Sequence, residues 1–362
     1  MAPSATNLIL LIILSIFINI PQILNIHAQQ QVPCLFFFGD SISDNGNNNA
    51  LTTLAKSNYP PYGIDFPDGL TGRFSNGEIV PDALAKFLGF ANPIPPFAAA
   101  RGSDILKGVN YASGGAGILD ESGIQLGSRI SMSRQLLNHQ ITVRRIQNMM
   151  RNQTTEKNNY VGRCLYVVNI GSNDYINNYF VPNTQTRRLQ TPDSFAETLI
   201  QKFSQQLRTL YNSGARKIAV FGVGLLGCIP QVIANNPTNA SGCVDFINNA
   251  VQLFNNKVKP LVDNLKSDLN GAQFTYINIT SISSADPSVL GIRVVNASCC
   301  PVSRQTGQCI PNRNPCSNRN EYIFWDNVHP TEIVNIAMAS RAYNATLPSD
   351  AYPVDIRRLV QQ

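Results

Sequence analysis

Short apolar runs alternate with longer amphipathic stretches along most of the chain, and this alternation constrains the fold more than any other feature. Five runs have the length and composition of buried strands: residues 34–38, 108–112, 164–170, 217–223 and 273–278. Five stretches have helical periodicity: residues 78–88, 129–152, 193–211, 245–269 and 331–342. Strands that alternate with helices pair in parallel, so we predict a three-layer α/β/α fold around a mainly parallel sheet of about five strands.

Two segments depart from this regular pattern. Pro260 lies inside the helical stretch 245–269 and predicts a kink or a break, because proline removes one backbone hydrogen bond. Residues 296–320 are rich in Cys, Asn and Pro and have no periodicity, which predicts an irregular excursion held by disulfides. No change in composition divides the rest, so we expect residues 29–362 to form a single domain.

The N-terminus has the pattern of a secretory leader. Residues 8–20 are apolar but too few to span a bilayer comfortably, and the small residue Ala28 follows, so we predict a signal peptide over residues 1–28. Residues 1–7 contain no Lys or Arg, which leaves a retained membrane anchor as the alternative. We expect a secreted, extracellular protein without a stable membrane span. The cell wall is one candidate for its extracellular location.

Cysteines and glycosylation sequons agree with secretion. The eight cysteines all follow the leader, and their even number allows four disulfides. No two have C-x-x-C spacing, which argues against a zinc ribbon or a thioredoxin-like site. The disulfide candidates are Cys228 with Cys243, and, in pairings left open, Cys299, Cys300, Cys309 and Cys316. The glycosylation candidates are Asn152, Asn239, Asn278, Asn296 and Asn344.

The charge pattern and one decoy motif exclude two classes of ligand. The net charge is +6, but no run of five or more Lys or Arg occurs, so nothing favours nucleic-acid binding. Gly222, Gly224 and Gly227 match the spacing of a dinucleotide-binding loop, yet Pro230 stands where the phosphate-binding helix should continue. We therefore expect no nucleotide cofactor.

A serine and a histidine stand out as candidates for chemistry. Ser41 follows the first apolar run, where the carboxyl end of a parallel strand would present a nucleophile, although Gly-Asp-Ser is also ordinary turn sequence. Of three histidines, His27 lies in the leader, His139 lies in a helical stretch, and His329 lies in W-D-N-V-H-P. Asp326 is near enough to orient His329 as a base. The alternative is a helix-capping Asp beside a surface His.

Two further loops offer hydrogen-bond donors. Residues 114–117, G-G-A-G, can turn backbone N–H groups into a cleft, and Asn173 follows the strand predicted over residues 164–170. Each loop alone is more often a simple turn. Together with a nucleophile and a base–acid pair, they supply what acyl transfer requires, including donors for a developing oxyanion.

These motifs, taken in order, resemble the plant GDSL esterase/lipase family of the SGNH hydrolase superfamily: F-G-D-S-I-S-D-N-G-N, Gly115, G-S-N-D and D-N-V-H-P. Ile42 replaces the leucine of the family name. The resemblance implies a flavodoxin-like sheet and no metal or organic cofactor. It implies Ser41 as nucleophile and oxyanion donor, Gly115 and Asn173 as further donors, His329 as base and Asp326 as its orienting partner. Gly115 is chosen from three glycines in its loop.

The expected function is that of a secreted serine esterase or lipase. Its substrates would be small-molecule or lipid esters, with cell-wall polysaccharide esters as another class. One alternative is an acyltransferase that uses the same site and passes the acyl group to a sugar or polyol. The other is a non-catalytic cell-wall glycoprotein on the same scaffold, against which the intact set of Ser41, Asn173, Asp326 and His329 counts.

Overall fold

The computed structural model describes residues 29–151, 159–238 and 242–362. The predicted signal peptide with its alternative membrane anchor, His27, and the sequons at Asn152 and Asn239 lie outside the described residues. Within these three ranges, no helix is long and apolar enough to cross a membrane.

A six-stranded sheet forms the centre of the molecule, in the order β2–β1–β3–β4–β5–β8. Its strands are β1 (Leu35–Gly39), β2 (Gly108–Asn110), β3 (Leu165–Asn169), β4 (Lys217–Phe221), β5 (Gln273–Ile277) and β8 (Ala351–Tyr352). The first five are parallel, as predicted, and β8 pairs antiparallel with β5. Strand β8 was not predicted, because two residues are too few to show a period.

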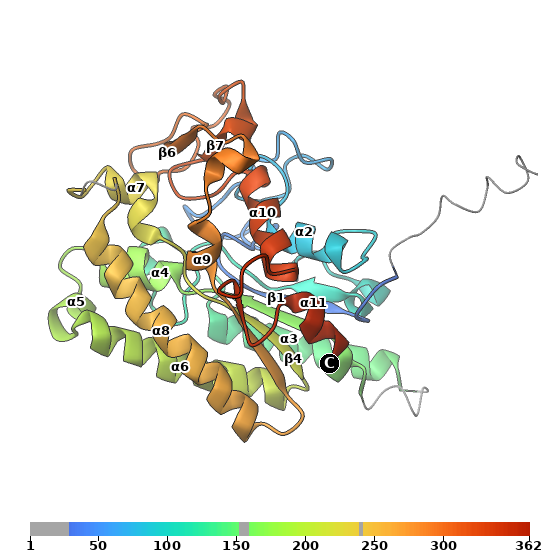
Figure 1. The fold of residues 1–362 in the computed structure, drawn as a ribbon. Coiled ribbons are helices and arrows are strands. Elements are labelled where there is room, and N and C mark those ends of the chain that lie inside the picture. Colours follow the sequence, from blue (N-terminus) through green and yellow to red (C-terminus); the bar gives the residue numbers. More distant parts are fainter. Residues whose placement is uncertain (1–28, 152–158, 239–241) are drawn as a thin grey trace, which may run out of the picture.

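Both faces of the sheet are covered, because side chains of β1 alternate between two apolar clusters. Phe36 and Phe38 pack into one cluster, and Leu35 and Phe37 into the other. The first cluster is covered by α3 (Met132–Met149), α6 (Pro192–Asn212) and α8 (Asp245–Asp268). The second is covered by α2 (Val80–Phe87), α10 (Glu332–Tyr343) and α11 (Ile356–Gln361). Figure 1 shows α6 beside α8 and α2 beside α10, which gives the predicted three layers.

The remaining helices are short and lie in the connections. They are α4 (Ser172–Asp174), α5 (Gln185–Leu189), α7 (Pro230–Ile233) and α9 (Ile279–Ser283). Further single turns are η2 (Gly102–Leu106), η3 (Ile124–Leu126), η5 (Val161–Arg163), η6 (Tyr175–Tyr179), η7 (Leu226–Cys228), η8 (Pro287–Leu290) and η9 (Arg319–Glu321).

Of the kink or break predicted at Pro260, the break is wrong, because α8 runs unbroken from Asp245 to Asp268. Pro260 lies on the exposed side of the helix, as does Asn256 one turn earlier. The Asn256 carbonyl, which loses its helical partner to the proline, lies on this exposed side, where an unmade backbone hydrogen bond costs least. The buried face of the helix still packs against its neighbours.

Four disulfides join the eight cysteines: Cys34–Cys164, Cys228–Cys243, Cys299–Cys316 and Cys300–Cys309. The Cys34–Cys164 bond was not among the sequence candidates. These two cysteines directly precede Leu35 and Leu165, which are partners in the register of β1 and β3. The predicted excursion contains two of the bonds, and its ends pair as strands β6 (Val294–Ser298) and β7 (Tyr322–Phe324). Figure 1 places this pair at one end of the molecule.

The strand order locates a crevice. The chain passes from β1 to β2 on one side and then crosses to β3 on the other. The direction in which strands are added to the sheet therefore reverses between β1 and β3, although the strands themselves stay parallel. Ligands of open α/β sheets bind at such a point, outside the carboxyl ends of the strands. The loops that follow β1, β2 and β3 carry Ser41, Gly115 and Asn173 respectively.

Candidate active site

Ser41 lies in a tight turn at the end of β1. The Asp40 Oδ1 atom accepts the N–H of Ile42 at 3.0 Å, which closes the turn around Ser41. The buried amide of Gln135, on α3, accepts the N–H of Gly39 at 2.9 Å and donates to the Gly39 carbonyl at 2.7 Å. This double contact fixes the backbone from which the serine projects.

Asp326, His329 and Ser41 form a continuous chain of hydrogen bonds. The two carboxylate oxygens of Asp326 lie 2.9 and 2.8 Å from Nδ1 of His329. On the other side of the ring, Nε2 lies 2.8 Å from Oγ of Ser41. A ring that donates from Nδ1 to the carboxylate leaves Nε2 as an acceptor for the serine hydroxyl. The turn after β7 makes this possible, because Asp326 Oδ1 also accepts the N–H groups of Val328 and His329 at 2.8 and 2.7 Å.

Asn173 and Gly115 are placed to supply donors beside the serine. One amide N–H of Asn173 donates to the Ala116 carbonyl at 2.9 Å, and its oxygen accepts from Asn177 at 2.6 Å. The second N–H of the same amide remains for a ligand. Gly115 has a φ of 81°, a left-handed conformation that favours glycine. Both residues line the same cavity as Ser41 and His329, whereas Gly114 and Gly117 do not.

Buried carboxylates and amides hold the glycine-rich loop in position. Asp44 accepts the N–H of Gly114 at 2.9 Å, and Asn48 donates to the Gly114 carbonyl at 2.9 Å. At the far end of the loop, Asp174 accepts the N–H of Ile118 at 2.7 Å. The polar run after Ser41 and the residue after Asn173 thus fix the loop that carries Gly115.

The cavity above Ser41 has a volume of about 240 Å³ and a mixed, neutral lining. Its apolar wall is formed by Leu54, Ala55, Phe74, Leu126, Ile176, Leu226, Ile229 and Val328. Its polar wall carries carboxamides and hydroxyls, from Gln125, Ser172, Asn177, Gln231, Gln305, Thr306 and Gln308. No Lys or Arg is among the described residues that line it. Such a space suits an uncharged molecule with both apolar and hydrogen-bonding parts.

Asp40, the only carboxyl group among the described residues of the lining, is only partly ionised at neutral pH. Burial is the largest influence and raises the pKa of Asp40 to about 7, against the lowering effect of the Ile42 N–H. Among the described residues, its Oδ2 atom has no hydrogen-bond partner. Asp326, by contrast, contacts the His329 ring with both carboxylate oxygens.

The structure brings together Ser41, Gly115, Asn173, Asp326 and His329, which the sequence analysis selected from four separate motifs. His139 lies elsewhere, buried in the core. The sequence analysis did not select Gln135, Asp44 or Asn48. The run D-N-G-N-N at 44–48 gives a signal for the last two, because consecutive polar residues that are all buried must have partners. Gln135 lies on a helix among other polar residues, and nothing in the sequence distinguishes it from them. Among the described residues, no group of three or more His, Cys, Asp or Glu could hold a metal ion.

Comparison with known proteins gives a consistent result. The GDSL-like Lipase/Acylhydrolase family model matches residues 35–342. GDSL esterase/lipase At1g29670 from Arabidopsis thaliana is 49% identical over 346 residues, which cover 94% of each chain. GDSL esterase/lipase At4g18970 from the same plant is 48% identical over 335 residues, which cover 91% of this chain and 92% of that protein. Among solved structures, phospholipase A1 from Streptomyces albidoflavus NA297 matches 84% of this chain and 94% of its own, at 13% identity and a TM-score of 0.35.

Proposed function

The chain belongs to the GDSL-like lipase/acylhydrolase family, and from this membership we propose that it is a secreted serine esterase acting through Ser41, His329 and Asp326. The observation that carries the proposal is the unbroken hydrogen-bond chain from Ser41 Oγ through the His329 ring to the Asp326 carboxylate. It ends at a cavity with unused donors, which is the arrangement that acyl transfer needs.

The reaction follows from which atoms face each other. Nε2 of His329 takes the hydroxyl proton as Ser41 Oγ attacks the ester carbonyl, and Asp326 stabilises the imidazolium that forms. The imidazolium then returns the proton to the departing alcohol, which leaves an acyl group on Ser41. Water, deprotonated by His329, attacks this acyl-enzyme and releases the acid. The oxyanion of each tetrahedral intermediate would accept from the Ser41 N–H, the Gly115 N–H and the second amide N–H of Asn173.

The lining of the cavity supports an uncharged carboxylic ester as the substrate. The apolar wall favours an acyl chain, and the carboxamide wall can bind hydroxyl or ether oxygens of the alcohol part. Small-molecule esters, lipid esters and acetylated polysaccharides share this chemistry. An anionic ester would find no cation among the described lining residues.

Secretion is supported by the four disulfides, which persist in oxidising compartments. Two predicted glycosylation sites, Asn296 and Asn344, are exposed. Asn278 is half-buried, and its side chain caps α9 by accepting the N–H of Ser281 at 3.2 Å, so we propose Asn296 and Asn344 as the better acceptors. Peptide masses of the protein secreted by a eukaryotic host, before and after glycan removal, test both the leader cleavage near Ala28 and these sites.

The decisive experiment compares the wild type with Ser41→Ala. A fluorophosphonate probe should label the wild type on Ser41 and leave the variant unlabelled, and the variant should lose turnover of p-nitrophenyl esters while its melting temperature stays unchanged. Labelling with hydrolysis supports an esterase. Labelling with product only when a polyol acceptor is added would indicate a transferase, and a folded wild type that is neither labelled nor active would leave a non-catalytic glycoprotein.

A further inference from the structure

A third hydrophobic cluster, separate from the two that cover the sheet, lies behind Asp326. It contains Tyr62, Trp325, Cys299, Cys300 and Cys309. Tyr62 is fully buried, and its hydroxyl donates to Asp326 Oδ2 at 2.6 Å. Burial, together with the charge of Asp326, raises the pKa of Tyr62 well above its usual value, so the phenol keeps its proton and remains a donor.

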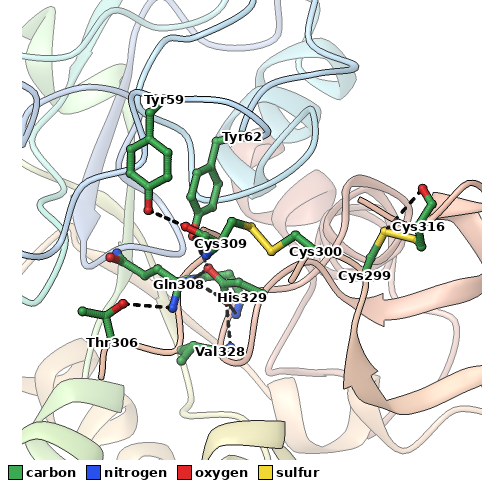
Figure 2. The surroundings of a disulfide bond; sticks show 11 residues. Tyr59, Tyr62, Cys299, Cys300, Thr306, Gln308, Cys309, Cys316, Val328 and His329 are labelled. Carbon is green, nitrogen blue, oxygen red and sulfur yellow. Dashed lines mark hydrogen bonds and ion pairs between the residues drawn. A yellow bond between two sulfur atoms is a disulfide. The ribbon is translucent and has the colours of Figure 1, made fainter. Parts of the chain in front are cut away.

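The excursion of residues 296–320 holds Tyr62 in this position. The Tyr62 oxygen accepts the N–H of Cys309 at 3.2 Å, and Cys309 is bonded to Cys300. Cys300 in turn donates its N–H to the Trp325 carbonyl at 2.9 Å, one residue before Asp326. The contacts therefore form a closed circuit that begins and ends at Asp326. Figure 2 shows Tyr62 directed at the Cys309 turn, with the disulfide to Cys300 beside it and His329 nearby.

The circuit completes the hydrogen bonding of the Asp326 carboxylate. Oδ1 accepts two backbone N–H groups from its own turn, at Val328 and His329. Oδ2 has no such backbone donor, and among the described residues its partners are the His329 ring and Tyr62. Donors on both oxygens prevent the carboxylate from rotating, and in a dry site they also share its charge. Without the phenol, Oδ2 would depend on His329 alone.

We propose that Tyr62 is a positioning residue for Asp326, and that the Cys300–Cys309 disulfide acts on catalysis by holding it. The proposal rests on the proposed function, because it assumes that Asp326 orients the base. It assigns to the excursion a role in turnover in addition to any role in stability. The excursion would then support the site through the Cys300–Cys309 disulfide and its contact with Tyr62.

The test compares Tyr62→Phe with a matched control, Tyr59→Phe. Tyr59 comes from the same loop, its ring centroid lies 5.3 Å from that of Tyr62, and its hydroxyl also contacts Cys309, donating to the carbonyl at 3.0 Å. It makes no hydrogen bond to Asp326. Each variant thus loses one phenol hydroxyl, one contact with Cys309 and the side-chain contact between the two tyrosines, and only Tyr62→Phe loses the contact with the carboxylate.

We expect Tyr62→Phe to lower kcat about tenfold with KM unchanged, because Tyr62 does not line the cavity and acts only through Asp326. A carboxylate with one donor fewer attracts a protonated imidazole more strongly, so the acidic limb of kcat/KM should move to higher pH by about half a pH unit. Tyr59→Phe should keep the wild-type kcat and pH profile. If the two variants behave alike, the inference is overturned.

Removal of the disulfide provides a second, independent test. The double variant Cys300→Ser, Cys309→Ser should lower kcat, with the concentration of active sites determined by fluorophosphonate titration. In a protein that already carries Tyr62→Phe, removal of the disulfide should lower kcat little further. Full additivity would contradict the proposal. If Tyr62→Phe does not fold, the disulfide variant carries the test alone, and an unchanged kcat in that variant would overturn the proposal. If the wild type itself is not labelled, the proposed function fails; if the wild type is labelled but Tyr62→Phe is unchanged, only the role of Tyr62 fails.

Discussion

Two buried histidines, His329 and His139, have opposite surroundings although both are hidden from solvent, with 5% and 0% of their surface exposed. His329 has a hydrogen-bond partner on each ring nitrogen, Asp326 on one side and Ser41 on the other. Among the described residues, the ring nitrogens of His139, on α3, have one hydrogen-bond partner, the Tyr111 hydroxyl 3.3 Å from Nδ1, and none at Nε2.

The environment of His139 is a cage of aromatic rings. Four rings meet it edge to face, with centroids 4.9 to 5.5 Å away: Phe36, Phe38, Tyr111 and Tyr166. No carboxylate is among them, so nothing offsets the loss of hydration, and burial lowers the pKa of His139 to about 3. The contrast teaches that burial alone disfavours a protonated histidine, whereas the carboxylate partner of His329 suits the role of base that we propose for it.

Replacing each histidine in turn tests this contrast, and replacement of His329 has the largest expected effect on kcat. His329→Ala should lower kcat by about 10⁴-fold, because no other group is placed to accept the Ser41 proton. His139→Leu should retain kcat within about threefold, since its cage of aromatic rings lies outside the cavity. Both are measured with one p-nitrophenyl ester at neutral pH. A variant at 139 that loses activity while staying folded would refute the distinction.

The same contrast extends to two buried amides, Asn173 and Asn255, which are 4% and 3% exposed. Asn173 faces the cavity with one free N–H, whereas Asn255 pairs with the Val223 backbone through both its oxygen and its nitrogen, at 2.9 and 2.8 Å. Asn173→Ala should lower kcat about 10²-fold with KM little changed, because its donor is needed most in the transition state. Asn255→Ala should instead lower the free energy of unfolding by about 1–3 kcal/mol.

Kinetics and urea unfolding of both amide variants separate the two outcomes. The pattern expected is loss of turnover at 173 with stability retained, and the reverse at 255. Equal losses of kcat in the two variants would mean that packing, and not an oxyanion donor, explains the importance of Asn173.

Much of this site was predictable, because its parts sit where periodic patterns end. The parallel strands were visible as apolar runs, and strand ends in α/β folds converge on one edge, so Ser41, the loop of residues 114–117 and Asn173 could be brought together from the sequence. The choice of Gly115 within that loop came from the family resemblance. His329 followed from scarcity, since three histidines leave few choices for a base.

Contacts that depend on tertiary packing were not predictable. Tyr62 lies in a Pro-rich loop 264 positions before Asp326, and no periodicity links the two. Cys34 and Cys164 required the knowledge that β1 and β3 are neighbours, which strand patterns alone do not provide. Pro260 misled because the sequence does not say which side of α8 faces water. Each of these cases depends on which surfaces meet.

The contrast between the two histidines also predicts how stability depends on pH at His139. In the unfolded chain this ring has an ordinary pKa near 6.5, and in the folded protein burial lowers the pKa of His139 to about 3. Between these values the unfolded state binds a proton that the folded state does not, so the free energy of unfolding falls as the pH drops below 6.5. From pH 6.5 to pH 4 the loss amounts to about 3 kcal/mol, at roughly 1.4 kcal/mol per pH unit.

Three buried carboxyls act in the opposite direction. Burial raises the pKa of Asp40 to about 7 and the pKa values of Asp44 and Asp174 to about 6, all from 3.8. Here the folded state binds the extra protons, so these groups stabilise the fold as the pH falls from about 7 towards 4. The pH dependence of the wild type is therefore a sum of opposing contributions and does not by itself reveal His139.

His139→Leu isolates the histidine, because the three carboxyls are present in both proteins and cancel in the difference. The stability of the variant minus that of the wild type should be constant above about pH 7.5 and should rise by about 3 kcal/mol as the pH falls to 4. Urea unfolding at a series of pH values measures this difference. A difference that stays flat from pH 7.5 to 4 would show that His139 takes up a proton in the folded state, and the contrast with His329 would then lose its physical basis.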